Sequence, residues 1–229
     1  GGAASSPAAT DGSTRVSPRL QVSALVPFGR FHIEVADVPG LRIAIEICED
    51  LWVPVTPSAI SALQGATVIA NPSASPVTIG RARRRRELVQ SQSSAAVCAY
   101  AYVAAGFGES SNDLSWDGQT LIYENGVELA SSPRFQRQIT ATLADVDLQL
   151  ISHQRLEQTS FTDNAAKLGV KEPVIVHTIL GAGLGAGESV AQADGVAEAP
   201  GRGHDHGTSA LTTLLRPVRQ FPFVPDEPQ

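Results

Sequence analysis

A cysteine among carboxylates is the residue of this sequence with the clearest potential for chemistry. Cys48 follows the segment IAIEI, 43–47, whose alternating isoleucines predict a half-buried strand. Three acids lie within two positions of the cysteine: Glu46, Glu49 and Asp50. Because negative neighbours disfavour the thiolate, these acids alone would make Cys48 a poor nucleophile.

The end of a strand is nevertheless a position that catalysis can use. The thiol of Cys48 can project from the edge of the sheet, and the backbone amide of Glu49 can point at a developing oxyanion. Free cysteines are also among the residues most often buried. The pattern alone therefore favours a structural cysteine, unless other segments supply a base and a cation.

The elements that must position Cys48 alternate between strands and helices, which predicts a mixed α/β layered domain. Pro39-Gly40 and Asn125-Gly126 mark two of the turns. The segment VCAYAYVAA, 97–105, fits either a helix end or a buried strand, because periodicity does not separate the two. The other expected elements are strands at 31–36, 41–47 and 66–75, a helix between Thr56 or Ser58 and Gly65, a helix from 81, a hairpin at 118–132, a strand at 138–144 and a helix from Asp145 or Asp147.

Composition excludes several classes of protein. The chain of 229 residues is 42% hydrophobic, with a formal net charge of −6 and a pI near 5.3, so we expect a packed core and no nucleic-acid partner. No apolar run reaches the length of a membrane span, and the first residues do not form a signal peptide, so we expect no membrane partner. Two cysteines make no secreted disulfide framework, which favours the cytoplasm.

Three parts differ in composition. We expect a flexible lead-in at 1–22, a domain at 23–164, and a low-complexity region with a linker at 165–229. In the last part, GAGLGAG, 181–187, lacks the βαβ context of a dinucleotide site, and HDH, 204–206, is more often solvated than metal-binding. We therefore expect no metal. The absence of any methionine indicates a piece of a longer protein.

Several motifs resemble a known family. EICEDLWVP, 46–54, resembles the cysteine segment of the nitrilase superfamily of carbon–nitrogen hydrolases. SPVTIGR, 75–81, and SSNDLSWDGQT, 110–120, are more specific and are similar to the glutaminase domain of glutamine-dependent NAD synthetase. The similarity runs from about 26 to about 164 and resumes at RQFPFVPDEP, 219–228, which resembles the link to the synthetase domain.

The resemblance implies a four-layer αββα nitrilase-type sandwich, incomplete here at its N-terminal half, and a Glu-Lys-Cys triad. In this family the cysteine attacks the side-chain amide of L-glutamine, a glutamate is the general base, and water releases glutamate from the thioester. The glutaminase step would need no cofactor. Its ammonia would pass to a synthetase domain of the same polypeptide, which uses ATP to amidate deamido-NAD, and a homo-oligomer is expected.

Four site residues follow from the resemblance, position by position. Cys48 matches the nucleophile, and the amide of Glu49 matches the backbone donor to the oxyanion. Ser75 and Arg81 match positions that bind glutamine. Their chemistry suits that role, because a guanidinium pairs with an α-carboxylate and a hydroxyl with a polar head group.

The triad glutamate and lysine have no counterpart in the sequence. In the family both precede the cysteine, whereas the only lysines here, Lys167 and Lys171, lie far downstream. Glu46 could share a strand face with Cys48, but nothing in the motif makes it the base. We therefore expect this chain alone to be inactive toward glutamine.

Other polar or reactive residues have plainer interpretations. Cys98 lies in an apolar segment and is expected to be buried. Four consecutive arginines, 83–86, point around a helix and are expected to form a solvated or inter-subunit face. Trp116 and Asp117 would either shape the substrate pocket or form a turn, and Glu109 would either orient substrate or lie exposed.

Two alternatives to a glutaminase remain open at this point. The chain could belong to another nitrilase-type amidase or carbamoylase, in which Ser75 and Arg81 would not matter for the substrate. It could also be a non-catalytic nitrilase-like module for assembly, although the complete motif around Cys48 argues against that.

Overall fold

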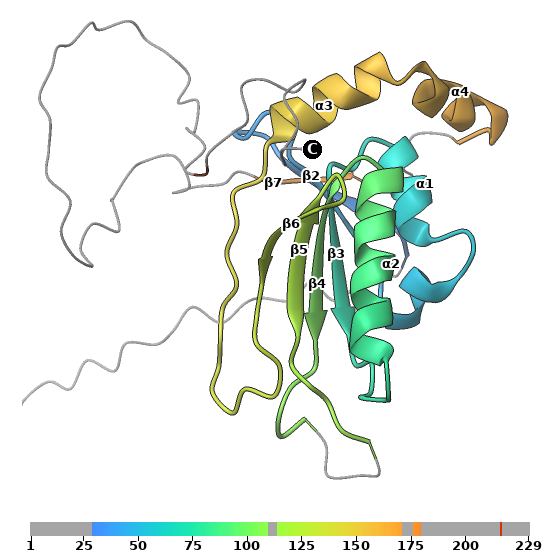
Figure 1. Ribbon diagram of the computed structural model, residues 1–229. Coiled ribbons are helices and arrows are strands. Elements are labelled where there is room, and N and C mark those ends of the chain that lie inside the picture. Colours follow the sequence, from blue (N-terminus) through green and yellow to red (C-terminus); the bar gives the residue numbers. More distant parts are fainter. Residues whose placement is uncertain (1–28, 110–113, 171–175, 180–215, 217–229) are drawn as a thin grey trace, which may run out of the picture.

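The computed structural model describes residues 29–109, 114–170, 176–179 and 216. The predicted α/β class is confirmed: a central sheet is covered by helices (Figure 1). The expected lead-in at 1–22, the segments 181–187 and 204–206, and Lys171 lie outside the described residues.

A mixed sheet forms the centre of the described structure. Its strands are β1 (His32–Val35), β2 (Arg42–Ile45), β3 (Val68–Ser73), β4 (Ala99–Ala104), β5 (Thr120–Glu124), β6 (Val127–Ser131) and β7 (Val176–Ile179). They lie side by side in the order β6-β5-β4-β3-β2-β1-β7. The neighbours β2, β3 and β4 run parallel, whereas the pairs β1–β2, β4–β5 and β5–β6 are antiparallel.

Helices connect these strands and cover one face of the sheet. They are the 3₁₀ helix η1 (Cys48–Trp52) and the α-helices α1 (Pro57–Leu63), α2 (Arg81–Ala95), α3 (Leu148–Glu157) and α4 (Thr159–Lys167). The helices α1 and α2 lie on the same side of the sheet, and α4 packs against α1 and α3 (Figure 1). Only Glu46 and Ile47 separate β2 from η1, so Cys48, the first residue of η1, lies close to the end of the strand.

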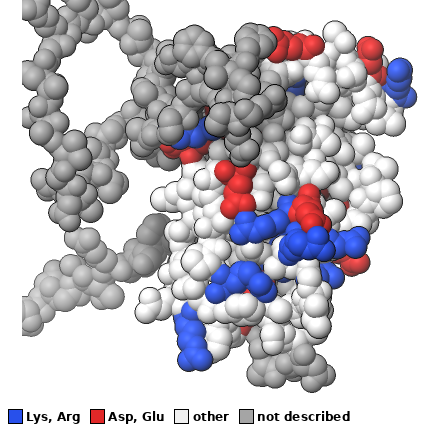
Figure 2. Space-filling model, in the orientation of Figure 1, with Lys and Arg blue, Asp and Glu red and all other residues white. Residues whose placement is uncertain are grey.

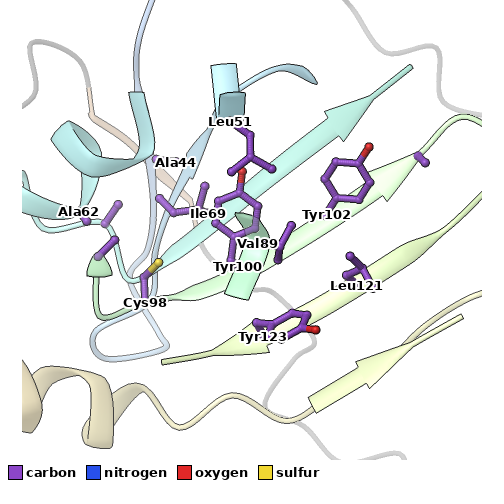
Figure 3. Packing of buried hydrophobic residues seen from close by; sticks show 13 residues of the cluster. Ala44, Leu51, Ala62, Ile69, Val89, Cys98, Tyr100, Tyr102, Leu121 and Tyr123 are labelled. Carbon is purple, nitrogen blue, oxygen red and sulfur yellow. The ribbon is translucent and has the colours of Figure 1, made fainter. Parts of the chain in front are cut away.

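The core fills the space between α2 and the sheet (Figure 3). Ile69, Tyr100 and Leu121 come from three adjacent strands, and Val89 comes from α2. All four are fully buried. Since side chains alternate between the two faces of a strand, these residues define the covered face of the sheet.

The other face of the sheet is apolar but open. Ile45 on β2 is 40% exposed and Val103 on β4 is 51% exposed. Both point away from the core, because their neighbours Ala44 and Tyr102 are buried on the covered face. The described residues thus supply one sheet and its covering helices, with an apolar surface on the opposite side.

The structure decides two alternatives that the sequence left open. Most of the segment 97–105 is a strand, since β4 covers 99–104 and pairs with both β3 and β5. Asp147 caps α3 by accepting a hydrogen bond from the Leu150 amide at 2.8 Å. The expected domain boundary at 164 falls inside α4, and β7 returns to pair with β1.

The predicted strand at 138–144 is wrong. No residue of this segment is in a strand, and Ile139 and Leu143 are 104% and 86% exposed. Its alternating pattern suits a strand, but a strand also needs a hydrogen-bonded neighbour, and none of the described strands pairs with it. Its Thr142 hydroxyl instead contacts that of Thr120 on β5.

Candidate active site

Cys48 lies at the sharp turn where η1 begins after β2. Its φ angle of +51° lies in the left-handed region, which non-glycine residues rarely adopt. The turn is held on one side by the Asp50 carboxylate, which accepts the Ile47 amide at 2.8 Å. The Cys48 amide donates to Oδ1 of Asn71 at 3.2 Å. The thiol is half-buried, so a substrate could reach it.

The amide of Glu49 has the freedom that an oxyanion donor needs. The Cys48 amide is engaged by Asn71, and the Asp50 amide donates to the Ile47 carbonyl at 3.0 Å. Within the part of the chain that the structure describes, the Glu49 amide between them makes no hydrogen bond. This leaves one backbone donor beside the thiol for a negatively charged oxygen.

The structure brings Ser75 and Arg81 into contact. Nε of Arg81 donates to Oγ of Ser75 at 3.0 Å. The guanidinium carbon of Arg81 lies 4.2 Å from the centre of the Trp52 ring, a cation–π contact that links α2 to η1. Ser75 is buried, whereas Arg81 is half-buried, and no described residue accepts a hydrogen bond from its terminal nitrogens.

A cavity of about 700 Å³ opens beside Arg81. It is lined by Trp52, Thr78, Ile79, Gly80, Arg81, Arg83, Arg84, Glu87 and Leu88. Basic side chains gather over α2 on this face of the molecule (Figure 2). The cavity is therefore suited to an anionic group. Arg81, the predicted ligand of the α-carboxylate, is one of its lining residues.

A second cavity, of about 550 Å³, has a different set of lining residues. It is formed by the turn between β1 and β2 together with α1, α3 and α4. None of the four predicted site residues lines it. It is not part of the candidate active site.

The prediction that residues 83–86 form a solvated face is wrong for Arg85. Its side chain is fully buried, and its Nη1 donates to both carboxylate oxygens of Asp117 at 3.0 Å and to Gln119 at 2.9 Å. Arg134 adds a second guanidinium to Asp117 at 2.9 Å. Burial by itself would raise the pKa of Asp117. The charge of Arg85 and the hydrogen bonds from Gln119, Arg85 and Arg134 together outweigh burial and hold that pKa below its usual range.

The remaining candidates divide between packing and exposure. Cys98 is fully buried, as predicted, and burial raises the pKa of its thiol to about 12, so it is inert near neutral pH. Asp117 forms an ion pair within the core, and Trp116 fixes the motif loop by donating to the Ala74 carbonyl at 3.0 Å. Glu109 lies exposed.

Sequence reasoning missed a polar group beneath Cys48. Glu46, Asn71 and Tyr100 are fully or almost fully buried and hydrogen-bonded to one another. Asn71 lies on the covered face of β3 together with Ile69 and Ser73. An asparagine at a core position of the predicted strand is the signal that could have revealed this polar group.

Three further features bear on the class of protein. Among the described residues, no three His, Cys, Asp or Glu side chains gather as metal ligands would. Lys167, the one lysine the structure describes, is exposed on α4. No helix within the described ranges has the length and apolar character needed to cross a membrane.

The fold and the position of Cys48 suit a hydrolase that uses a cysteine nucleophile at the end of a strand. Residues 11–155 match the carbon-nitrogen hydrolase family, so the chain belongs to that family. It is 45% identical to the glutamine-dependent NAD(+) synthetase of Mycobacterium tuberculosis over 194 residues, 85% of this chain and 25% of that protein. The corresponding protein of Mycobacterium leprae is 45% identical over 204 residues, 89% of this chain and 27% of that protein.

A solved structure of another glutamine-dependent NAD(+) synthetase also matches. The glutamine-dependent NAD(+) synthetase from Cytophaga hutchinsonii is 28% identical, with a TM-score of 0.38, over 50% of this chain and 18% of that one. The chain spans about a quarter of the length of the two mycobacterial relatives.

Proposed function

We propose that this domain hydrolyses the side-chain amide of L-glutamine through a thioester on Cys48. The observation that carries the proposal is the half-buried Cys48 at a strained turn, next to the free amide of Glu49. The 45% identity to glutamine-dependent NAD(+) synthetases supports glutamine as the substrate.

The chemistry begins when the Cys48 sulfur attacks the amide carbon of glutamine. The new C–S bond converts the carbonyl into a tetrahedral oxyanion, and the Glu49 amide donates a hydrogen bond to it. Collapse breaks the C–N bond and releases ammonia once the nitrogen has taken a proton. Water then attacks the thioester, which frees glutamate and restores the thiol.

A base and a cation must activate the thiol, because its own neighbours are acids. In this proposal a glutamate takes the thiol proton and a lysine helps to hold the oxyanion. We expect this glutamate and this lysine to come from segments outside the described residues. The 229-residue chain alone is therefore expected to be inactive.

Substrate recognition falls to Ser75 and Arg81. Arg81 binds the α-carboxylate of glutamine with its terminal nitrogens, because its Nε is already occupied by Ser75. The Trp52 ring beneath the guanidinium keeps it from turning away. A substrate amide without an α-carboxylate would lose this contact.

The product of the proposed reaction is ammonia. It would feed the amidation of deamido-NAD at a synthetase domain of the same polypeptide, where ATP would also bind. None of the four site residues is assigned to ATP or deamido-NAD, and the glutaminase step uses no cofactor. A cytoplasmic homo-oligomer is part of the proposal.

The test compares two cysteine variants of the complete gene product. Cys48→Ala should abolish glutamine hydrolysis and glutamine-dependent NAD formation while leaving NAD formation from added ammonia. Cys98→Ala, the matched control, should keep both. Hydrolysis of glutamine by the Cys48→Ala protein would overturn the assignment of the nucleophile.

A third variant tests the substrate. Arg81→Ala should raise the KM for glutamine at least about tenfold, as expected when a charged hydrogen bond to a carboxylate is removed. An unchanged KM for glutamine would instead favour an amidase that acts on a different amide.

A further inference from the structure

The conformation of Cys48 requires an external support. A left-handed φ of +51° is unfavourable for a residue with a Cβ atom, and such strain persists only where the surrounding structure holds it. Asp50 holds the turn from the side of Ile47, and the contact made by Cys48 itself is the hydrogen bond from its amide to Oδ1 of Asn71, at 3.2 Å. The position of the proposed nucleophile therefore depends on Asn71.

Asn71 is itself fixed at both ends of its amide group. Its Oδ1 accepts from Ser73 Oγ at 2.8 Å as well as from Cys48. Its Nδ2 donates to the Tyr100 hydroxyl at 2.9 Å and lies 3.5 Å from Oε1 of Glu46. A flipped amide would place its donors against the Cys48 amide, so these partners set the orientation.

Glu46 completes the group and ties it to a helix. Tyr100 donates its hydroxyl proton to Oε1 of Glu46, and the Ser58 amide donates to Oε2 at 2.7 Å. Ser58 lies in the first turn of α1, where the helix dipole favours a negative group. Glu46 is 2% exposed, and Asn71 and Tyr100 are fully buried, so the carboxylate is held away from water.

We propose that Glu46, Asn71 and Tyr100 are positioning residues that fix the Cys48 peptide, so that Asn71 takes its amide while the amide of Glu49 stays free for the oxyanion. The role in catalysis rests on the proposed glutaminase function. None of the three touches the substrate. They act through the backbone of the nucleophile.

The geometry separates this role from that of a general base. Both oxygens of Glu46 already accept hydrogen bonds from buried donors. Among the described residues no hydrogen bond joins Glu46 to the Cys48 sulfur. A general base must reach the proton that it removes. Glu46 instead points into the core, two residues before the thiol.

The donors and acceptors of this group allow an exchange experiment. In Glu46→Gln the new NH₂ faces the NH₂ of Asn71, and in Asn71→Asp the new carboxylate faces that of Glu46. Each single variant therefore creates a mismatch. The double variant E46Q/N71D removes it by reversing the bonds within the group. The amide introduced at position 46 donates to Tyr100 and to the carboxylate introduced at position 71. That carboxylate accepts from Tyr100 and still accepts from Cys48 and Ser73.

The first readout is amide hydrogen exchange of the peptide that contains Cys48, in the complete gene product. Each single variant should speed exchange there at least about tenfold, because the mismatch with its buried neighbour displaces the side chain at position 71 from the Cys48 amide. The double variant should return toward wild type. Val89→Ala is the control for general destabilisation: it removes core packing from α2 and should leave exchange at Cys48 unchanged after correction for global stability.

The second readout is glutamine turnover by the same proteins. Each single variant should lower kcat about tenfold or more with KM changed less than about threefold, and the double variant should recover most of the kcat. Unchanged exchange in the single variants would overturn the proposal. Faster exchange with unchanged kcat, or a double variant that does not recover kcat, would overturn it too.

The two readouts keep this inference separate from the function on which it rests. If the wild-type protein leaves glutamine intact, the proposed glutaminase function fails, and with it the catalytic role of the group. Exchange at Cys48 then still decides whether the three residues hold its peptide.

Discussion

Two cysteines in one chain differ because their surroundings differ. Cys98 is enclosed by the core, and burial raises the pKa of its thiol to about 12. Cys48 lies at the end of β2, half-buried and strained. At the scale of residues, sequence could predict both positions, because an apolar run encloses one cysteine and an acidic turn follows the other. It could not predict the support of Cys48, since Asn71 and Tyr100 are 23 and 52 positions away.

The burial of Arg85 also depends on a residue far away in the sequence. Four consecutive arginines look alike in sequence, yet Arg83 pairs with Glu87 at the surface whereas Arg85 is enclosed. The difference comes from Asp117, which lies 32 positions away and meets Arg85 only after α2 has packed on the sheet. A run of arginines therefore predicts exposed side chains only where no residue distant in the sequence supplies a buried counter-charge.

Asp117→Asn should strongly destabilise the chain. The substitution leaves the guanidinium of Arg85 buried without its counter-charge, which typically costs about 3–5 kcal/mol of unfolding free energy. Urea denaturation followed by circular dichroism measures the loss. Glu87→Gln, the control, removes an exposed ion pair with Arg83 and should cost less than about 1 kcal/mol. Equal losses in the two variants would contradict the buried ion pair.

Among the elements, prediction succeeded where the local chemistry was decisive. Asn125-Gly126 predicts the hairpin of β5 and β6, and both residues adopt positive φ angles of 45° and 81°. It failed at 138–144, where alternation suggests a strand but no partner strand among the described residues pairs with it. The segment 97–105 was undecided for the same reason, and its neighbours β3 and β5 made it a strand.

Gly126→Ala should lower the free energy of unfolding by more than the strain of its backbone conformation alone. A Cβ atom at this position would lie 3.0 Å from the Cβ of Ser94 on α2, so the hairpin could no longer pack closely on the helix. Strain at the positive φ contributes about 1–2 kcal/mol, and overpacking adds about 1–3 kcal/mol.

Gly108→Ala is the matched control for this prediction. Its φ of +87° is similar, but a Cβ atom there meets nothing within 4 Å. It should therefore show the backbone cost alone, about 1–2 kcal/mol by urea denaturation. If the two alanine variants were equally destabilised, the contact between hairpin and α2 would not limit this position.

For the molecule as a whole, the two faces of the sheet differ in kind. One face is packed against α2, with Ile69, Tyr100 and Leu121 fully buried. The other presents aliphatic side chains, including Ile45 and Val103, that lie on either side of β3. In the four-layer sandwich expected from the resemblance, a second sheet covers such a face. Without that cover, an apolar surface favours self-association.

The double variant I45K/V103K should keep the 229-residue chain from associating with itself. Lysine at both positions places charge on the open face without disturbing the core, so the unfolding free energy should change by less than about 1 kcal/mol. Size-exclusion chromatography with light scattering should show a mass closer to the monomer than for wild type. Val55→Lys is the control, since Val55 is 69% exposed but lies in the loop between η1 and α1. Because the open face is the surface that needs covering, the control should associate as wild type does. An equal effect of Val55→Lys would mean that added charge alone, rather than loss of the apolar face, prevents association.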